Sequence, residues 1–151
     1  MLNETTIETL NALKLFGMAH GLAGRLADPA QADLTHAEFV GLLVQDEKAD
    51  RDNRRLKRLL RNAKLKQEAS MENIDYRHSR GLHKQVMLEL GNTRWLEAGR
   101  NVILTGPTGV GKSYIACALG NMAAREGFTV LYIRASRLFE SLGAARADGS
   151  H

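Results

Sequence analysis

Apolar residues in the first part of the chain recur at helical rather than strand spacing. Their first series predicts a short helix through Met18, which Pro29 ends at the latest. Thr5 and Glu8 have the spacing of a capping box, in which two side chains satisfy free N–H groups at a helix start. We therefore expect this helix to open at Thr5. The apolar residues that carry the prediction are Ile7, Leu10, Leu13 and Met18.

A longer helix is predicted from about residue 36 to residue 69, because Thr35 and Glu38 repeat the capping-box spacing. Its apolar residues fall at i, i+3, i+4 and i+7, and two more continue the stripe at intervals of seven. One face of this helix is therefore expected to be buried. The stripe consists of Leu42, Ala49, Leu56, Leu59, Leu60 and Ala63.

A third helix is predicted after a polar stretch. It carries the apolar residues Leu82, Val86 and Leu90, and the Gly-Asn pair at 91–92 is its stop signal. The connector that follows contains the only tryptophan, Trp95. We expect Trp95 to pack this connector onto the domain that follows, rather than to lie near a nucleotide base.

The pattern changes from residue 101 onward. Residues 101–105 and 128–133 are short aliphatic runs typical of buried strands. Between them lie a glycine-rich loop over 106–113 and a predicted helix over 114–126 that Gly127 would end. A last helix is expected to start at Ser136 as its N-cap. Strand, loop, helix, strand, helix is the order typical of a parallel α/β sheet.

The glycine-rich loop matches the pattern G-x-x-x-x-G-K-[ST] in full. Glycines allow successive backbone N–H groups to point at phosphates, and the following helix adds its positive N-terminal end. In this motif the lysine, Lys112, contacts the β- and γ-phosphates, and the hydroxyl of Ser113 is a ligand for Mg²⁺. The sequence therefore predicts ATP and Mg²⁺ binding. The predicted nucleotide-binding residues are Gly106, Pro107, Thr108, Gly109, Val110, Gly111, Lys112 and Ser113.

These elements predict the α/β class, as a P-loop NTPase with a parallel-sheet core over residues 98–151, preceded by an all-α domain over residues 1–97. A sheet of this kind has roughly five strands, and two are predicted, so we expect an incomplete core with exposed strand edges. Hydrolysis also needs an acidic residue at the end of an apolar strand. Asp148 follows a predicted helix instead, so we do not assign it that role.

Composition adds constraints on compartment and class. Hydrophobic residues make up 44% and charged residues 25% of the 151 positions, which is ordinary for a globular protein. The single cysteine cannot form an internal disulfide, which fits a reducing compartment. Neither a secretory signal nor a membrane-spanning apolar run is present in the sequence. We therefore expect a cytoplasmic protein without a membrane partner.

Positive charge is concentrated in one segment. Residues 51–66 hold eight basic side chains and one acidic one, a local charge of +7 against +4 for the whole chain. Such a face is either solvated or contacts a phosphate backbone. The segment has few carboxylates and no expected i,i+4 acid partners that would neutralise its charge. We therefore favour contact with duplex DNA, which makes 1–97 a DNA-binding domain. The candidate residues are Arg51, Arg54, Arg55, Lys57, Arg58, Arg61 and Lys64.

A second basic cluster follows this run. It is either a polar connector or a further contact surface, in which Tyr76 would be the stacking group. Its basic members are Arg77, His78, Arg80, His83 and Lys84.

Several segments together resemble one known family. They are NRRLKRLLRNAKLKQEASMENIDYRHSRGL, NVILTGPTGVGKSYIACALG, VLYIRASRLFESL and ARADGS. They are similar to the IstB transposition-helper ATPases, which are relatives of the DnaC-type helicase loaders within the AAA+ group. The resemblance implies a helical DNA-engaging domain, an AAA+ core, ATP-dependent homo-oligomeric assembly on duplex DNA, and a partner transposase of an insertion sequence.

The resemblance extends to the phosphate loop residue by residue. Gly106, Gly109, Gly111 and Lys112 match the family, and Ser113 stands where the family more often has threonine. The resemblance implies ATPase activity. The family's Walker B acidic pair, sensor residue and arginine finger have no counterpart in this sequence, so we expect a C-terminally truncated member.

Three functions remain possible on this basis. The first is an ATP-binding helper of DNA transposition that binds DNA and cooperates with a transposase. The second is a helicase-loader-like adaptor that grips a replicative helicase and uses ATP as a switch. The third is a small-molecule kinase, which the long helical and basic preface argues against. The dense basic face favours the first over the second.

Overall fold

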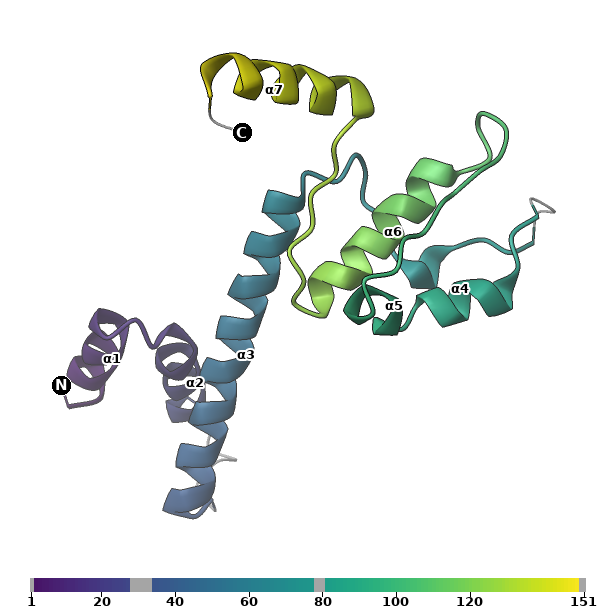
Figure 1. Ribbon diagram of the computed structural model, residues 1–151. Helices are drawn as coiled ribbons and strands as arrows, with labels where there is room; N and C mark the ends of the chain where they lie inside the picture. The colour runs from purple at the N-terminus through teal and green to yellow at the C-terminus, as the bar shows by residue number, and fades with distance from the viewer. Residues whose placement is uncertain (1, 28–33, 78–80, 150–151) are drawn as a thin grey trace. The chain divides into compact units, whose positions relative to one another are not determined.

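The computed structural model describes residues 2–27, 34–77 and 81–149. The chain forms two compact units, Met1–Lys57 and Arg58–His151. Every regular element in the described ranges is helical, as Figure 1 shows. The boundary between the units falls inside one long helix, and the predicted domains 1–97 and 98–151 stay predictions.

Two helices stand where one short helix was predicted. They are α1 (Leu2–Ala12) and α2 (Phe16–Leu26). Lys14 breaks the helix because its backbone is left-handed, with a φ of 61°. The N–H of Leu15 then donates to the carbonyl of Leu10 at 2.8 Å, a bond that closes the end of α1. The prediction of one continuous helix is wrong at this point.

The predicted capping box at the start of the longer helix is confirmed. Helix α3 (His36–Ala63) follows Thr35, whose hydroxyl accepts a hydrogen bond from the Glu38 N–H at 3.3 Å. The Glu38 carboxylate accepts one from the Thr35 N–H at 2.9 Å. The other predicted box is wrong, because Thr5 lies inside α1. α3 ends earlier than predicted because Lys64 adopts a left-handed φ of 51°.

Close approach of α2 to α3 organises the first unit. Gly17 and Ala19 are buried on α2, and Leu43 and Glu47 are buried on α3. A Cβ on Gly17 would lie 2.5 Å from the backbone carbonyl oxygen of Asp46. Only a glycine allows the two backbones to come this near, so Gly17 determines the packing of this unit.

The predicted apolar stripe of α3 is partly or fully buried at every position except Ala49, and most deeply toward its C-terminus. There Ala63 is fully buried, and Leu59 and Leu60 are partly buried. In the first half of the helix Ala49 is exposed, so its place in the stripe is wrong. The buried positions there are Leu43 and Glu47. A polar residue in the stripe could not be found by counting apolar side chains.

In its described residues, the second unit contains the end of α3 and four further helices with a short 3₁₀ turn. Its core joins Met87 of α4 to Cys117 and Ala118 of α6, with Ala69 and Ile74 from the segment between α3 and α4. The elements are η2 (Met71–Asn73), α4 (Lys84–Leu90), α5 (Arg94–Glu97), α6 (Lys112–Arg125) and α7 (Ala135–Asp148).

The predicted parallel-sheet core is wrong, because no strand is present in the described ranges. Residues 101–105 and 128–133 lack helical structure but form no strand ladder. The backbone N–H of Tyr132 donates instead to the carbonyl of Ala63 at 2.7 Å. A strand requires a partner strand at the right register, and aliphatic composition alone does not supply one. Ile103 and Leu131 are accordingly 83% and 63% exposed.

The helices around these segments agree better with the prediction. α4 begins at Lys84, so the prediction that Leu82 lies on it is wrong, but it ends at Leu90, directly before the predicted stop at Gly91. α6 begins two residues before the predicted helix and ends one residue earlier than predicted, just before Gly127, whose φ is 89° and favours glycine. α7 begins at Ala135 with Arg134 as its N-cap, so the prediction that Ser136 would be the N-cap is wrong.

Candidate functional site

A loop of glycines precedes α6 in the second unit. Gly106, Gly109 and Gly111 have φ values of 145°, 87° and 96°. Residues with side chains adopt this region only at a cost, so the glycines are required for the course of the loop. Backbone of this kind can turn successive N–H groups toward one side and form a concavity for an anion.

The first turn of α6 leaves its backbone N–H groups without a side-chain cap. Its N-cap is Gly111, which has no side chain to accept a hydrogen bond. A helix start of this kind carries a partial positive charge and free donors. A phosphate or another anion placed there would satisfy both.

Lys112, the first residue of α6, reaches back over the loop. Its Nζ donates to the carbonyl oxygens of Gly106 at 2.8 Å and Pro107 at 2.5 Å. These contacts hold a positive charge beside the loop and α6 N-terminus. Ser113 follows as the second residue of the helix and is partly buried. The predicted loop residues 106–113 are thus continuous with the helix start, as the motif requires.

A pocket of about 240 Å³ lies directly beside the loop. Val110, Gly111, Tyr114 and Ile115 line one part of it. The remaining lining comes from the segment between α3 and α4, namely Asn73, Ile74, Asp75 and Leu82. Its volume is below the ~300–1,000 Å³ of whole-ligand pockets, so it suits one ring system rather than an entire nucleotide. The sequence pattern does not indicate this pocket, because no motif marks the segment that completes it.

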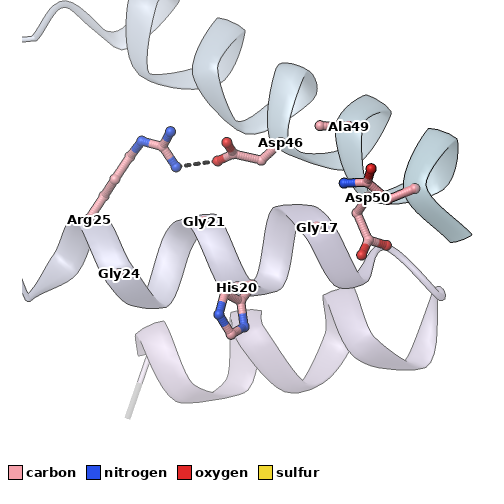
Figure 2. A pocket seen from close by; sticks show the side chains of 9 residues that line it. Gly17, His20, Gly21, Gly24, Arg25, Asp46, Ala49 and Asp50 are labelled. Carbon is pink, nitrogen blue, oxygen red and sulfur yellow. Dashed lines mark hydrogen bonds and ion pairs between the residues drawn. The ribbon is translucent and has the colours of Figure 1, made fainter. Parts of the chain in front are cut away.

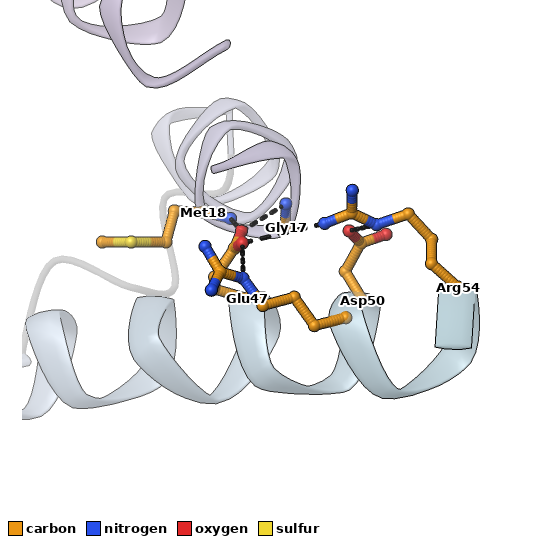
Figure 3. A network of polar contacts seen from close by, with 6 residues as sticks. Gly17, Met18, Glu47, Asp50 and Arg54 are labelled. Carbon is orange, nitrogen blue, oxygen red and sulfur yellow. Dashed lines mark hydrogen bonds and ion pairs between the residues drawn. The ribbon is translucent and has the colours of Figure 1, made fainter. Parts of the chain in front are cut away.

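The N-terminal part of the basic run is not free of acid partners, contrary to the sequence analysis. Figure 3 shows the network around the buried carboxylate of Glu47. Arg51 Nε donates to Glu47 Oε1 at 2.6 Å, and Arg54 Nε lies 2.7 Å from Asp50 Oδ2. Each acid precedes its arginine by one helical turn, so both lie just before the segment 51–66. The guanidinium of Arg54 also lies 5.1 Å from the ring centroid of Phe16.

The same carboxylate caps α2. Oε2 of Glu47 accepts hydrogen bonds from the backbone N–H of Gly17 at 2.8 Å and of Met18 at 3.2 Å. Burial raises the pKa of Glu47, but the hydrogen bonds from Arg51, Met18 and Gly17 outweigh it, so the pKa lies below the ordinary carboxyl value. Glu47 is therefore a structural anion, and Arg51 is its exposed ion-pair partner one helical turn further along α3.

The rest of the basic run is accessible. Its five remaining candidates are exposed, and no ion pair to any of them is found among the described residues. They are Arg55, Lys57, Arg58, Arg61 and Lys64. These side chains, rather than the whole run, offer charge to a partner.

The second basic cluster is partly neutralised. Arg77 donates to Asp75 from Nε at 3.0 Å and from NH2 at 3.1 Å. The hydrogen bond and charge of Asp75 raise the pKa of Arg77. Lys84 Nζ lies 6.0 Å from the ring centroid of Tyr76, the predicted stacking residue. His78 and Arg80 lie outside the described residues.

Trp95 occupies a structural position. Its indole Nε1 donates to the carbonyl of Leu90 at 2.9 Å, which ties α5 to the end of α4. Trp95 also lines a groove of about 460 Å³ with residues of α6 and of the two extended segments. This supports the expectation that it packs the connector.

A cleft of about 500 Å³ in the first unit is shown in Figure 2. The glycine face of α2, with Gly17 and Gly21, forms one wall, and Asp46 and Asp50 of α3 lie on the other. An ion pair between Arg25 and Asp46 crosses it. Because Asp46 pairs with Arg25 and Asp50 pairs with Arg54, we assign no ligand to this cleft.

The described ranges contain neither a membrane-spanning helix nor a cluster of metal-ligating side chains. None of their helices has the length and apolar character needed to cross a bilayer. No group of three or more His, Cys, Asp or Glu side chains is placed there to hold a metal ion.

Comparison with known proteins gives a consistent result. The family model described as IstB-like ATP binding protein matches residues 8–151. A Pseudomonas fluorescens protein named as an ATP-binding protein of insertion sequence IS1162 is 43% identical, over 99% of this chain and 65% of its own length. A Sinorhizobium fredii protein named as an insertion sequence ATP-binding protein is 42% identical, over 100% of this chain and 62% of its own length.

A Mycobacterium tuberculosis protein named as an ATP-binding protein in an insertion sequence is 41% identical, over 93% of this chain and 56% of its own length. The chain therefore spans less than two thirds of the length of each of these relatives.

Proposed function

Because the chain belongs to the family of IstB-like ATP-binding proteins, we propose that it binds ATP and acts as a helper in the transposition of an insertion sequence. The observation that carries the ATP assignment is the start of α6. There an uncapped helix N-terminus, three left-handed glycines and the ammonium of Lys112 converge. Each of the three favours an anion, and together they fit a polyphosphate.

The residues fit the nucleotide in distinct roles. Backbone N–H groups of Gly106, of residues 108–111 and of the first turn of α6 bind the phosphates. Lys112 exchanges its two exposed contacts with loop carbonyls for phosphate oxygens. The pocket beside Val110 and Tyr114 holds the base. Mg²⁺ supplies charge neutralisation between the phosphates, and the Ser113 hydroxyl is the side chain that would bind it.

Duplex DNA is the second proposed ligand. The exposed cations of the basic run support it, because phosphate contacts come chiefly from Arg and Lys side chains. We further propose that the protein cooperates with a transposase, assembles as a homo-oligomer and works in the cytoplasm, where both DNA and ATP are present. The insertion-sequence names of its relatives support this role over that of a helicase-loading adaptor.

The test of ATP binding is the Lys112→Ala variant, measured by fluorescence titration with a labelled ATP analogue. Loss of a hydrogen bond to a charged group costs about 1.5–3 kcal/mol, so we expect roughly 10- to 100-fold weaker binding. Lys48→Ala, an exposed lysine on α3, is the matched control and should bind as the wild type does. Equal affinity of the wild type and Lys112→Ala would refute the assignment.

A further inference from the structure

A polar groove of about 830 Å³ lies in the second unit, away from the glycine loop residues. The end of α3 contributes Arg61, and Lys64 follows directly. Helix α6 contributes Asn121 and Arg125 from its last turns. Asn73, from the 3₁₀ turn between α3 and α4, completes the polar lining. Three separate segments thus bring cations and amides to one depression.

The chemistry of this lining matches a sugar–phosphate backbone. Arginine, lysine, asparagine and serine side chains are the groups that contact phosphate and sugar oxygens in DNA complexes. Ser70 and Gln67 add further polar groups to the groove. Glu68 is the one carboxylate in the lining, against the three cations Arg61, Lys64 and Arg125. The groove is therefore net positive.

We propose that this groove binds the phosphate backbone of duplex DNA, with Arg61, Lys64 and Arg125 as its phosphate contacts. The proposal rests on the proposed DNA-binding function and localises it. It places the contact toward the C-terminal end of the basic run, where Arg61 and Lys64 line the groove, whereas Arg51 and Arg54 lie outside this lining and pair with Glu47 and Asp50. It also adds a residue of α6 that the sequence pattern does not single out.

One of the three proposed phosphate contacts, Arg125, already pairs with a carboxylate of the protein, that of Glu72. Arg125 NH1 donates to Glu72 Oε1 at 2.9 Å, and both side chains are about half exposed or more. Ion pairs of this exposure are weak because water screens them. A DNA phosphate can therefore replace Glu72 as the partner of Arg125, while Arg61 and Lys64 need give up no ion pair found among the described residues.

The first test measures how DNA affinity depends on salt. Fluorescence anisotropy with a labelled duplex, repeated over a range of NaCl concentrations, gives the slope of log K against log salt. Each lost phosphate contact lowers this slope by about 0.9, so the Arg61→Gln, Lys64→Gln, Arg125→Gln triple variant should lower it by about 2.7. The control is the triple Arg134→Gln, Arg137→Gln, Arg146→Gln, which removes equal charge from exposed positions at and within α7.

The outcomes distinguish the proposed DNA binding from its proposed location in the groove. A lower slope in the groove variant with an unchanged slope in the control supports the groove. Equal slopes in the wild type and the groove variant overturn the groove but leave DNA binding in place. A wild type that does not bind DNA at low salt overturns DNA binding itself, and the groove with it. Far-UV circular dichroism confirms that each variant is folded before its slope is compared.

A second test measures whether bound DNA covers the groove. Cys117 is fully buried, so the thiol introduced by Asn121→Cys is the accessible one for a maleimide. Saturating duplex DNA should slow its labelling at least 10-fold and leave a Ser136→Cys thiol on α7 unaffected. Labelling that DNA does not slow overturns the proposal. Protection by inorganic phosphate at the same ionic strength overturns it as well, because the groove would then be a site for free anions.

Discussion

Replacement of Glu47 tests whether this carboxylate holds α2, α3 and Arg51 together in the first unit. In Glu47→Ala, the N–H groups of Gly17 and Met18 lose their acceptor, and Arg51 loses its carboxylate partner at 2.6 Å (Figure 3). Gly17 is buried and Met18 is partly buried at this point, so water cannot fully replace the lost oxygen atoms. We therefore expect the first unit to lose stability while the second unit keeps its fold.

The magnitude follows from the contacts. An unsatisfied buried donor costs about 1–3 kcal/mol, and two are created, although Met18 at 3.2 Å is the weaker of the two. Glu47 is 7% exposed, so solvent screening reduces these values only in part. We expect Glu47→Ala to lower the free energy of unfolding by about 3 kcal/mol. Glu47→Gln keeps one oxygen acceptor and should lose about 1–2 kcal/mol.

The assay is urea unfolding followed by two probes. Circular dichroism at 222 nm reports all helices, while fluorescence of Trp95 reports the second unit. With an m-value of about 1 kcal/mol/M for a small domain, Glu47→Gln should shift the dichroism transition by about 1–2 M. The Trp95 transition should not move. If Glu47→Ala unfolds at the same urea concentration as the wild type, the capping role of Glu47 is wrong.

Three further predictions follow from single positions. Gly17→Ala should destabilise the first unit by several kcal/mol in urea unfolding, because its Cβ would meet backbone atoms of Asp46 that cannot move aside; wild-type stability would contradict the close packing. The pKa of Glu47 is lower in the folded than in the unfolded state, so its contribution to stability is present above the ordinary carboxyl pKa and is lost as the pH falls below it. Glu47→Gln should flatten this part of a stability–pH profile, and an unchanged profile would assign the effect elsewhere. The Cβ of Gly109→Ala would meet no neighbouring atom, but the φ of 87° at this position strains any residue that has a side chain. We therefore expect weaker ATP binding with the helices intact. Unchanged affinity would show that ATP binding does not require this backbone conformation.

Features determined by neighbouring residues were predicted well from the sequence. The capping box of Thr35 and Glu38 was predicted correctly, because its partners are three positions apart. The end of α6 before Gly127 was found for the same reason. The break at Lys14 was missed, because a left-handed lysine has no sequence signature comparable to that of glycine.

Features that depend on distant residues were predicted poorly. Residues 101–105 and 128–133 have strand composition, yet pairing is a property of two segments, and these two do not pair. The pocket beside the glycine loop depends on Asn73 and Asp75, which only the fold brings near Tyr114. Glu47 was overlooked in the stripe of α3 because its burial is compensated by backbone donors of α2.

One part of the missed information was nevertheless present in the sequence. Glu47 and Arg51, like Asp50 and Arg54, have the i,i+4 spacing of helical ion pairs. Counting charge only within residues 51–66 placed both acids outside the segment and overestimated the charge available to a partner.

These two ion pairs change the salt dependence that we expect for DNA binding by the basic run. Seven candidate cations would give a salt slope near 6 at about 0.9 per phosphate contact. If Arg51 and Arg54 stay with their acids, five remain, and Arg125 from the groove brings the number to six. The expected upper limit is then about 5.4. Arg51→Gln should leave the slope unchanged and lower stability, whereas Arg61→Gln should lower the slope by about 0.9 at unchanged stability. A fold-stabilising cation and a ligand-binding cation on the same helix are thus distinguished by which of the two measurements responds.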